Sequence, residues 1–347
     1  MLEPAQKFLI IRLSSIGDIV HALPAVAALG GSFPSAKIDW VVESRYALLL
    51  EGNPFVHRII TLDTLGWRKN LQSARTLKSV WRGLRVLREV RYDAAIDFQG
   101  LYKSAVIARL SRATERVGFA EIRLREPAAA ALYTVRVPVR EQAHVIEWNL
   151  ALVEHLGVSR IDRTQWQFPL PSSQADDQYV GHQLRARGCE DFVIVNPGGG
   201  WRSKCWAPEN YAGVIRRLAD EFEFLLTGSA DEEPLCAGII RSSGTPRAKY
   251  FPSTIPQFIA LARRARLFVG GDTGPLHLAA AVGTPIVGIY GPTDPARNGP
   301  FSSEDVTLWN RGPIDYTRRA KNADWIPGIS VDSAVDAIRQ RLKRAHG

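Results

Sequence analysis

The chain lacks long apolar runs, paired cysteines and low-complexity tracts, and each absence excludes a class of protein. No apolar run reaches the ~20 residues needed to span a bilayer, and the opening residues, with an early Glu3, do not resemble a secretory signal. The three cysteines form no CxxC pair, which argues against a disulfide framework and a zinc site. We therefore expect a globular protein of the reducing cytoplasm.

Two nucleotide-binding motifs and one metal motif are also missing. After the first predicted strand a dinucleotide site would need GxGxxG, but Gly17 stands alone. GxxxxGK[ST], the phosphate-binding loop, does not occur. Since neither a DxD pair nor a His/Asp cluster occurs, nothing in the sequence indicates a required metal.

What the chain does contain is a regular alternation of strands and helices in both halves. Its 347 residues suggest two domains, on a prior of about 150 residues each. Strands are predicted at residues 7–13, 37–43, 58–62 and 93–98, and again at 191–196, 223–227, 266–270 and 285–290. Helices are predicted at 18–29, 76–90, 145–156, 208–221 and 275–282. This pattern is typical of an α/β protein with two doubly wound parallel sheets.

A stretch rich in Gly, Pro and Ser at residues 157–178 is predicted to link the two domains. We place the first domain at 1–165 and the second at 166–330. Residues 331–347 are predicted to form a closing helix. Its apolar face consists of Val331, Ala334, Val335, Ile338 and Leu342.

The net charge of +9 is concentrated in one segment. Residues 67–125 contain 14 basic and 5 acidic residues, and the rest of the chain is neutral overall. Within that segment a predicted helix at 75–90 has an apolar face and an opposite basic face. The apolar face is Leu77, Val80, Trp81, Leu84, Leu87 and Val90, and the basic face is Arg75, Lys78, Arg82 and Arg85. A charged stripe is ordinarily only a solvated face, but this excess favours an anionic macromolecule or membrane surface, with nucleic acid as the rival partner.

Asp18 follows the first strand at the start of a helix, where open α/β sheets bind their ligands. The alternative is a helix-capping carboxylate, which the residues alone favour. In the second half, Gly198, Gly199 and Gly200 would let backbone N–H groups approach an anion, and Lys204 would add a mobile charge. A flexible turn beside a surface lysine would look the same.

The most informative segment is GGDTGPLHLAAAVGTP, at residues 270–285. Asp272, Thr273 and Gly274 lead from a strand into a helix that begins at a proline, and such a helix end attracts anions. Asp272 would suit sugar hydroxyls, while His277 would ordinarily be a buried neutral histidine bonded to backbone. Glu232, after another strand, could accept ribose hydroxyls or simply favour the helix N-terminus.

Together these segments resemble the ADP-heptose:lipopolysaccharide heptosyltransferases, glycosyltransferase family 9. The resemblance rests on SSIGDIVHALPA (14–25), DWVVE (39–43), DFQGLYKSA (97–105), REP (125–127), residues 204–208, DTGPLHLAAAVGTP (272–285) and YGPTDP (290–295). DWVVE, QGLYKSA and REP look most like heptosyltransferase I. The resemblance implies GT-B architecture: two facing Rossmann-like domains, acceptor on the first and nucleotide sugar on the second, with the final helix packing back on the first.

The resemblance also implies roles for individual residues. Asp18 matches the catalytic base. The implied donor-binding residues are Gly198, Gly199, Gly200, Lys204, Glu232, Asp272, Thr273, Gly274 and His277. The implied acceptor-binding residues are Ser15, Gly17, Arg68, Lys69, Gln99, Lys103 and Arg125. Family members often have Thr or Ser where this chain has the three glycines, and Trp201 and Arg202 receive no role.

The implied reaction is an inverting, metal-independent transfer of heptose from ADP-heptose to a 3-deoxy-D-manno-octulosonic acid residue of lipid A, without a cofactor. Asp18 would deprotonate the acceptor, and Lys204 and the helix amides would assist departure of ADP. The enzyme would work peripherally at the cytoplasmic face of the inner membrane. The alternatives are transfer onto a first heptose, as in heptosyltransferase II, a sugar-nucleotide epimerase, and a nucleic-acid-binding protein.

Overall fold

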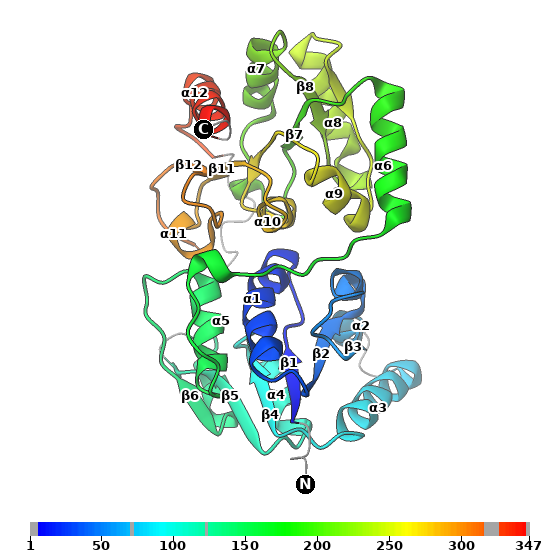
Figure 1. Cartoon of the computed structure of the whole chain (residues 1–347), viewed down its shortest axis with the longest axis vertical. Coiled ribbons are helices and arrows are strands. Elements are labelled where there is room, and N and C mark those ends of the chain that lie inside the picture. The colour runs from blue at the N-terminus through cyan, green and yellow to red at the C-terminus, as the bar shows by residue number, and fades with distance from the viewer. Residues whose placement is uncertain (1–5, 70–72, 122–123, 316–325, 345–347) are drawn as a thin grey trace. The chain divides into compact units, whose positions relative to one another are not determined.

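The computed structural model describes residues 6–69, 73–121, 124–315 and 326–344 (Figure 1). The chain divides into two compact units, 1–171 and 172–347. The division falls inside the predicted linker and six residues beyond the predicted boundary at 165. Among the described residues, no helix combines the length and apolarity that crossing a membrane requires. Cys189, Cys205 and Cys236 are free and buried.

The first unit is a parallel six-stranded sheet in the order β3-β2-β1-β4-β5-β6. The strands are β1 (Lys7–Ile11), β2 (Lys37–Glu43), β3 (Arg58–Leu62), β4 (Ala94–Asp97), β5 (Glu115–Phe119) and β6 (Val135–Val137). The helices are α1 (Ile16–Ser32), α2 (Thr64–Lys69), α3 (Ala74–Arg88), α4 (Tyr102–Leu110) and α5 (Val145–Glu154), with short 3-10 turns η1 (Ser44–Leu49), η3 (Pro127–Leu132) and η4 (Arg163–Gln165).

Burial on both faces explains the apolar strands of this sheet. Helices α1 and α5 pack on each other over one face, and α3 and α4 pack together over the other (Figure 1). In β1, Leu9 and Ile11 belong to the core beneath α3 and α4, and the alternate residue Ile10 is equally buried. Because successive side chains point to opposite faces, only a run of apolar residues suits such a strand.

The second unit repeats this topology, with strand order β12-β11-β10-β7-β8-β9. Its strands are β7 (Phe192–Asn196), β8 (Glu223–Leu226), β9 (Ala248–Tyr250), β10 (Leu267–Gly271), β11 (Ile286–Tyr290) and β12 (Val306–Trp309). Its helices are α6 (Gln174–Arg187), α7 (Pro208–Leu218), α8 (Glu233–Ser243), α9 (Ile255–Ala262), α10 (Gly274–Ala281), α11 (Pro295–Asn298) and α12 (Val331–Arg344), with turns η5 (Arg202–Lys204) and η6 (Ala230–Glu232). α6, α9 and α10 pack together, as do α7, α8 and α12.

The closing helix α12 begins at the predicted residue and ends at Arg344, the last described residue. Its apolar face, including Ala334, Ile338 and Leu342, is part of the core of the second unit. The helix packs against α7, β11 and β12. Within the second unit this helix therefore covers β11 and β12, and the packing on the first unit that the resemblance implies stays a prediction.

In each unit the chain crosses over between the two central strands, β1 and β4 in the first and β7 and β10 in the second. Loops that leave such a switch point diverge and open a crevice at the carboxyl edge of the sheet, where open α/β sheets bind ligands. The loops after β1 and β4 carry Asp18 and Gln99. Those after β7 and β10 carry Gly198–Gly200 and Asp272. The fold thus gathers most of the predicted site residues at two sheet edges.

Candidate functional site

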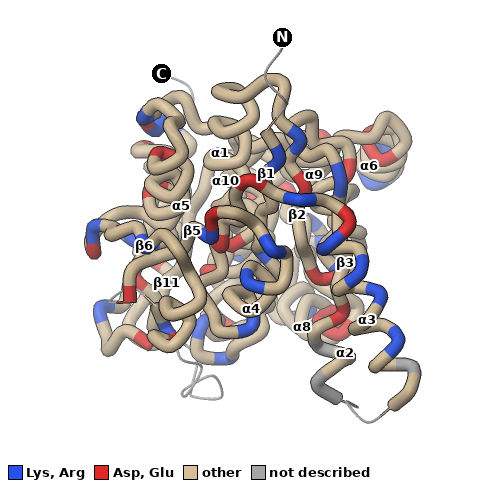
Figure 2. The backbone as a smooth tube through the Cα atoms, turned by 90° about the horizontal axis from the view of Figure 1, so that it is seen from below, with Lys and Arg blue, Asp and Glu red and all other residues tan. Residues whose placement is uncertain are grey.

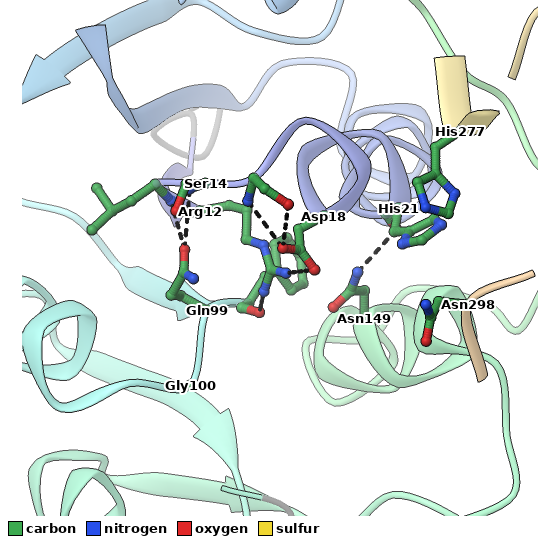
Figure 3. Close-up of polar contacts among 12 residues, drawn as sticks. Arg12, Ser14, Asp18, His21, Gln99, Gly100, Asn149, His277 and Asn298 are labelled. Carbon is green, nitrogen blue, oxygen red and sulfur yellow. Dashed lines mark hydrogen bonds and ion pairs between the residues drawn. The ribbon is translucent and has the colours of Figure 1, made fainter. Parts of the chain in front are cut away.

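Asp18 lies in the first turn of α1 and is both a helix cap and a solvent-accessible carboxylate. Its Oδ2 accepts hydrogen bonds of 2.9 Å from the backbone N–H and from the hydroxyl of Ser15 (Figure 3). Its Oδ1 forms an ion pair with Arg12, a buried residue at the end of β1. The Asp18 side chain nevertheless remains 40% exposed. The capping interpretation is therefore confirmed, and a charged, oriented oxygen is still available to a ligand.

The loop before α1 is held by the loop after β4. Gln99 Oε1 accepts from the backbone N–H groups of Leu13 and Ser14 at 3.0 and 3.2 Å (Figure 3). Arg12 also donates to the carbonyl of Phe98. Gln99, predicted to contact the acceptor, thus positions the β1–α1 loop through its carbonyl oxygen. Arg12 belongs to no ligand-binding motif, and sequence reasoning did not select it. The feature that could have identified it is a charged residue directly after the apolar run of β1.

Asp97 anchors this arrangement from the end of β4. It is fully buried and accepts from the backbone N–H groups of Gln99 and Gly100 and, at 2.7 Å, from the hydroxyl of Tyr133. Burial raises the pKa of Asp97, although these hydrogen bonds act in the opposite direction. Its partners are uncharged groups, so the residue fixes the loop without supplying charge to a ligand.

The predicted acceptor-side residues spread over several loops of the first unit. Lys103 on α4 donates to Thr64 at 3.4 Å, and Thr64 in turn donates to the buried Glu43, so α4 and the start of α2 lie together. The side chains of Arg68 and Lys69 lie outside the described residues. Gly17 is buried in α1, Ser15 bonds Asp18, and Arg125 is exposed before η3.

In the second unit, Asp272 follows β10 and receives four side-chain contacts. Lys204 Nζ lies 2.6 Å from Oδ2. Thr293 and Asn298 donate to the same oxygen at 2.8 and 3.1 Å, and His277 Nε2 lies 3.0 Å from Oδ1. Although burial opposes it, the charges and hydrogen bonds of Lys204 and His277 lower the pKa of Asp272 well below its usual range. The buried Asp272 carboxylate therefore links the segments that follow β10 and β11 to the turn η5.

Three of these contacts were not expected from the sequence. His277, expected to bond backbone, bonds the Asp272 carboxylate through Nε2. Thr293 and Asn298, which sequence reasoning did not select, follow β11, the neighbour of β10 in the sheet. Thr293 lies within YGPTDP and Asn298 three residues after it. That motif follows a predicted strand, which is the feature that could have identified both residues. Trp201, which had received no role, lies with its ring 4.8 Å from Lys204 Nζ.

The start of α10 has the features of an anion site. Thr273 is the N-cap residue, yet its side chain makes no capping bond, and its buried Oγ1 has no hydrogen-bond partner among the described residues. The first amides of a helix have no intrahelical partner and carry partial positive charge. The ammonium of Lys204 is close to the backbone as well, 3.5 Å from the carbonyl oxygen of Asp272. A buried bare hydroxyl, helix amides and an ammonium together suit a phosphate.

The glycine loop after β7 is tightly packed rather than merely flexible. A Cβ on Gly198 would lie 2.0 Å from Glu232 Oε1, and one on Gly199 would lie 3.0 Å from Thr273 Cγ2, whereas Gly200 has open space. Glu232 also caps its own turn, since Oε2 accepts from the N–H and hydroxyl of Ser229. Gly198 and Gly199 therefore allow the predicted ribose-binding and phosphate-binding residues to approach one loop.

Solved structures resemble the whole chain. The Escherichia coli heptosyltransferase WaaC with ADP is 27% identical, with a TM-score of 0.81, and the match covers 97% of this chain and all of the other. E. coli ADP-heptose lipopolysaccharide heptosyltransferase II, 21% identical with a TM-score of 0.75, has the same fold. Two doubly wound units, each with its polar residues at the switch point, thus define a glycosyltransferase of the GT-B class.

The sequence comparisons are more specific. The model of glycosyltransferase family 9 (heptosyltransferase) matches residues 80–324. Lipopolysaccharide heptosyltransferase 1 of Pseudomonas aeruginosa is 31% identical over 316 residues, 88% of this chain and 84% of that protein. The protein of the same name from E. coli K12 is 30% identical over 307 residues, 86% and 92% of the two chains. The chain belongs to glycosyltransferase family 9.

Proposed function

We propose that this enzyme transfers L-glycero-D-manno-heptose from ADP-heptose to a 3-deoxy-D-manno-octulosonic acid residue of the lipid A inner core. The names of the relatives support the reaction, and structures of WaaC with ADP and with ADP-2-deoxy-2-fluoro heptose support the donor. The observation in this chain that carries the proposal is the buried Thr273 hydroxyl at the start of α10, which has no hydrogen-bond partner in the described part of the chain and lies beside the Lys204–Asp272 pair.

The donor-binding unit offers one group for each part of a nucleotide sugar. The diphosphate would bind Thr273 Oγ1, the first amides of α10 and Lys204. The ribose would bind Glu232, whose Oε2 is engaged by Ser229 while Oε1 lies against Gly198. Because Lys204, Thr293, Asn298 and His277 all contact the Asp272 carboxylate, we propose that Asp272 acts mainly by orienting them, with the heptose bound beside Asn298.

In the proposed reaction Asp18 accepts the proton of the acceptor hydroxyl as that oxygen attacks the anomeric carbon of the donor. The bond from this carbon to the phosphate oxygen breaks, and its electron pair leaves with ADP. Lys204 and the α10 amides stabilise the developing charge in the manner of an oxyanion hole. The ion pair with Arg12 holds the Asp18 carboxylate in place. We propose that proton transfer occurs late, after positive charge has developed on the sugar. Attack opposite the leaving group inverts the anomeric centre.

We propose that no metal takes part. The charge that a divalent cation would neutralise on the diphosphate falls instead to Lys204 and the helix end. Among the described residues no group of three or more His, Cys, Asp or Glu side chains is arranged to bind a metal. A chelator should leave the transfer rate unchanged, and restoration of a lost rate by one divalent ion would contradict this part of the proposal.

The acceptor is proposed to be an anionic glycolipid, bound by the first unit at the cytoplasmic face of the inner membrane. Lipid A and its acidic sugars carry phosphates and carboxylates, which suit Lys103 and Arg125. The wider excess of basic residues at 67–125 suits the anionic membrane surface around the acceptor. The chain would associate with the membrane peripherally. This assignment uses the charge of the first unit, whereas the donor assignment uses the geometry of the second.

Radiolabelled ADP-heptose tests the proposal. Label should pass to an acceptor that ends in 3-deoxy-D-manno-octulosonic acid. Transfer only to an acceptor that already bears one heptose would favour the heptosyltransferase II alternative. An altered free nucleotide sugar, with no label on either acceptor, would favour an epimerase. In a parallel experiment ADP should raise the melting temperature more than UDP or GDP does, and equal shifts would contradict the adenine donor.

A further inference from the structure

Helix α3 leaves two large side chains of its predicted apolar face in solvent. Leu77 is 58% exposed and Trp81 is 69% exposed. The helix is held on its other side, where Leu87 is 2% exposed in the core of the first unit and Val86 packs against that core. Because residues four apart in a helix are neighbours, Leu77 and Trp81 form one exposed apolar edge.

Basic side chains run beside this edge. Lys78, Arg82 and Arg85 are exposed, and none of them forms a hydrogen bond or ion pair with a described residue. Between residues 74 and 88 the helix contains no acidic residue. Lys78 and Arg85 lie three and four residues from Trp81, so cations and indole share one face. Figure 2 shows the basic positions along α3. The side chain of Arg75 lies outside the described residues.

A lipid surface accounts for both parts of this face. Anionic headgroups attract each nearby cation, and the boundary with the acyl chains accepts leucine while tryptophan favours the interface itself. A nucleic acid would use the cations and could stack on Trp81, but it would leave Leu77 in water. An amphipathic helix with a basic face and Leu and Trp on its apolar edge is the pattern of an interfacial helix.

We propose that α3 is the membrane-contact helix: Leu77 and Trp81 enter the boundary of an anionic lipid layer, and Lys78, Arg82 and Arg85 bind its headgroups. The inference rests on the proposed function, because an acceptor anchored in a membrane must be reached at its surface. It goes beyond that function by assigning the contact to particular residues of one helix.

Sedimentation with vesicles tests the charge contribution. The wild-type chain should bind phosphatidylcholine vesicles that contain phosphatidylglycerol and should not bind phosphatidylcholine alone at low salt. The triple variant Lys78→Gln, Arg82→Gln, Arg85→Gln should bind on the order of a hundredfold more weakly, from about fivefold per cation. Its matched control removes three exposed cations of the second unit, Arg185→Gln, Arg241→Gln and Lys343→Gln. Equal losses in both variants would show that net charge alone drives binding and would overturn the assignment to α3.

The apolar contribution needs its own test. Leu77→Ser with Trp81→Ser should weaken binding to the anionic vesicles by about tenfold or more, whereas Leu48→Ser, at a residue 45% exposed elsewhere in the first unit, should not. As a second readout, a Trp81→Cys variant labelled with an environment-sensitive fluorophore should shift its emission to the blue on anionic vesicles. The three native cysteines are buried. If the emission on anionic vesicles is the same as in water, Trp81 does not enter the lipid layer, and the proposal is overturned whatever the serine variants show.

Failure of this inference can be told apart from failure of the proposed function. With an acceptor stripped of its acyl chains, the α3 variants should transfer heptose at the wild-type rate. With the acceptor in vesicles they should be slower. Absence of transfer by the wild-type chain to either acceptor would refute the function and leave vesicle binding to be judged separately. Binding to a DNA duplex that needs Lys78, Arg82 and Arg85, with no binding to vesicles, would replace the lipid by nucleic acid.

Discussion

The two units have the same strand order and place a buried aspartate at corresponding points, yet the two aspartates behave in opposite ways. Asp97 ends β4 and Asp272 follows β10, each strand being the partner of the first strand of its unit across the switch point. Burial raises the pKa of Asp97, whereas Lys204 and His277 overcome burial and lower the pKa of Asp272. The difference lies in the partners: a phenol and backbone amides in one unit, an ammonium and an imidazole in the other.

This contrast shows how the same topology can hold an exposed carboxylate in one unit and a buried, paired carboxylate in the other. In the first unit the exposed carboxylate is Asp18, in the first turn of the helix after β1, with a side chain 40% exposed. In the second unit the corresponding loop after β7 carries the three glycines, and the carboxylate lies after β10 with a side chain only 4% exposed. An exposed carboxylate can exchange protons with a substrate. A buried one that is saturated with donors organises a cation for an anionic ligand.

Removing the exposed carboxylate of the first unit should have the largest effect on the transfer rate. Asp18→Ala should lower the transfer rate by about a thousandfold, the scale of general base catalysis. The melting shift on adding ADP should stay as in the wild type, because the proposed donor-binding residues belong to the other unit. Asp231→Ala, which removes an exposed acid of the second unit, is the matched control. Substantial residual transfer by Asp18→Ala would refute the base assignment.

Removing the Lys204 cation should weaken donor binding and slow the transfer. Lys204→Ala should lower kcat/KM by about a hundredfold or more, as expected when one stabilising donor to the leaving group is lost, and it should also reduce the melting shift caused by ADP. Lys249→Ala is the control, because that lysine pairs with Glu223, away from Asp272. Wild-type kinetics in Lys204→Ala would exclude the proposed role.

The two buried aspartates should differ in stability and in the sign of its dependence on pH. Asp272→Asn leaves the partly buried Lys204 without its anion and should cost about 3 kcal/mol of unfolding free energy at pH 7. Asp97→Asn should cost only about 1 kcal/mol, since its partners are uncharged. Chemical unfolding of the purified variants measures both.

The pH dependence follows from the direction of each pKa shift. Asp272 has a lowered pKa in the folded state, so its contribution is present above its ordinary pKa of 3.8 and is lost as pH falls below that value. Asp97 has a raised pKa, so protonation favours the fold, and its contribution increases as pH falls toward 3.8. Parallel slopes for the two variants would show that the aspartates are alike.

The smallest expected effect is at the helix cap. Thr273→Val keeps the shape of the side chain and removes only the hydroxyl that has no partner. If that hydroxyl binds phosphate, the affinity for ADP should fall about tenfold, the lower end of the range for one hydrogen bond to a charged group. Isothermal titration measures this affinity. Thr284→Val, whose lost hydroxyl donates to Ala262, controls for general destabilisation and should leave ADP affinity unchanged.

Sequence reasoning predicted the central strands of each sheet and one edge strand, β3, but missed the other three edge strands, β6, β9 and β12. β2 and β3 have the predicted bounds, because apolar runs between polar residues leave little choice of register. The strands β5, β6, β9 and β12 were not predicted. They are short, and segments such as Val135–Val137 and Ala248–Tyr250 contain a basic residue that an edge strand tolerates.

The site residues were predictable where they follow a strand in a motif, as Asp18, Thr273 and the glycine loop do. Their partners were not, because Thr293 and Asn298 reach Asp272 from 21 and 26 residues away. Only the pairing of β10 with β11 brings them there. The exposure of Leu77 and Trp81 could not be predicted for a similar reason. Helical periodicity identifies an apolar face but does not show how much of that face the sheet covers.

The packing of α12 also sets an order of events during synthesis. The first unit has all its strands and helices once residue 171 has been made. The second unit cannot complete its core until Ile338 and Leu342 of α12 have left the ribosome. Domains fold as units, with the N-terminal one first. A nascent chain should therefore acquire the proposed acceptor-binding unit, with its basic helix α3, before it can hold a nucleotide sugar.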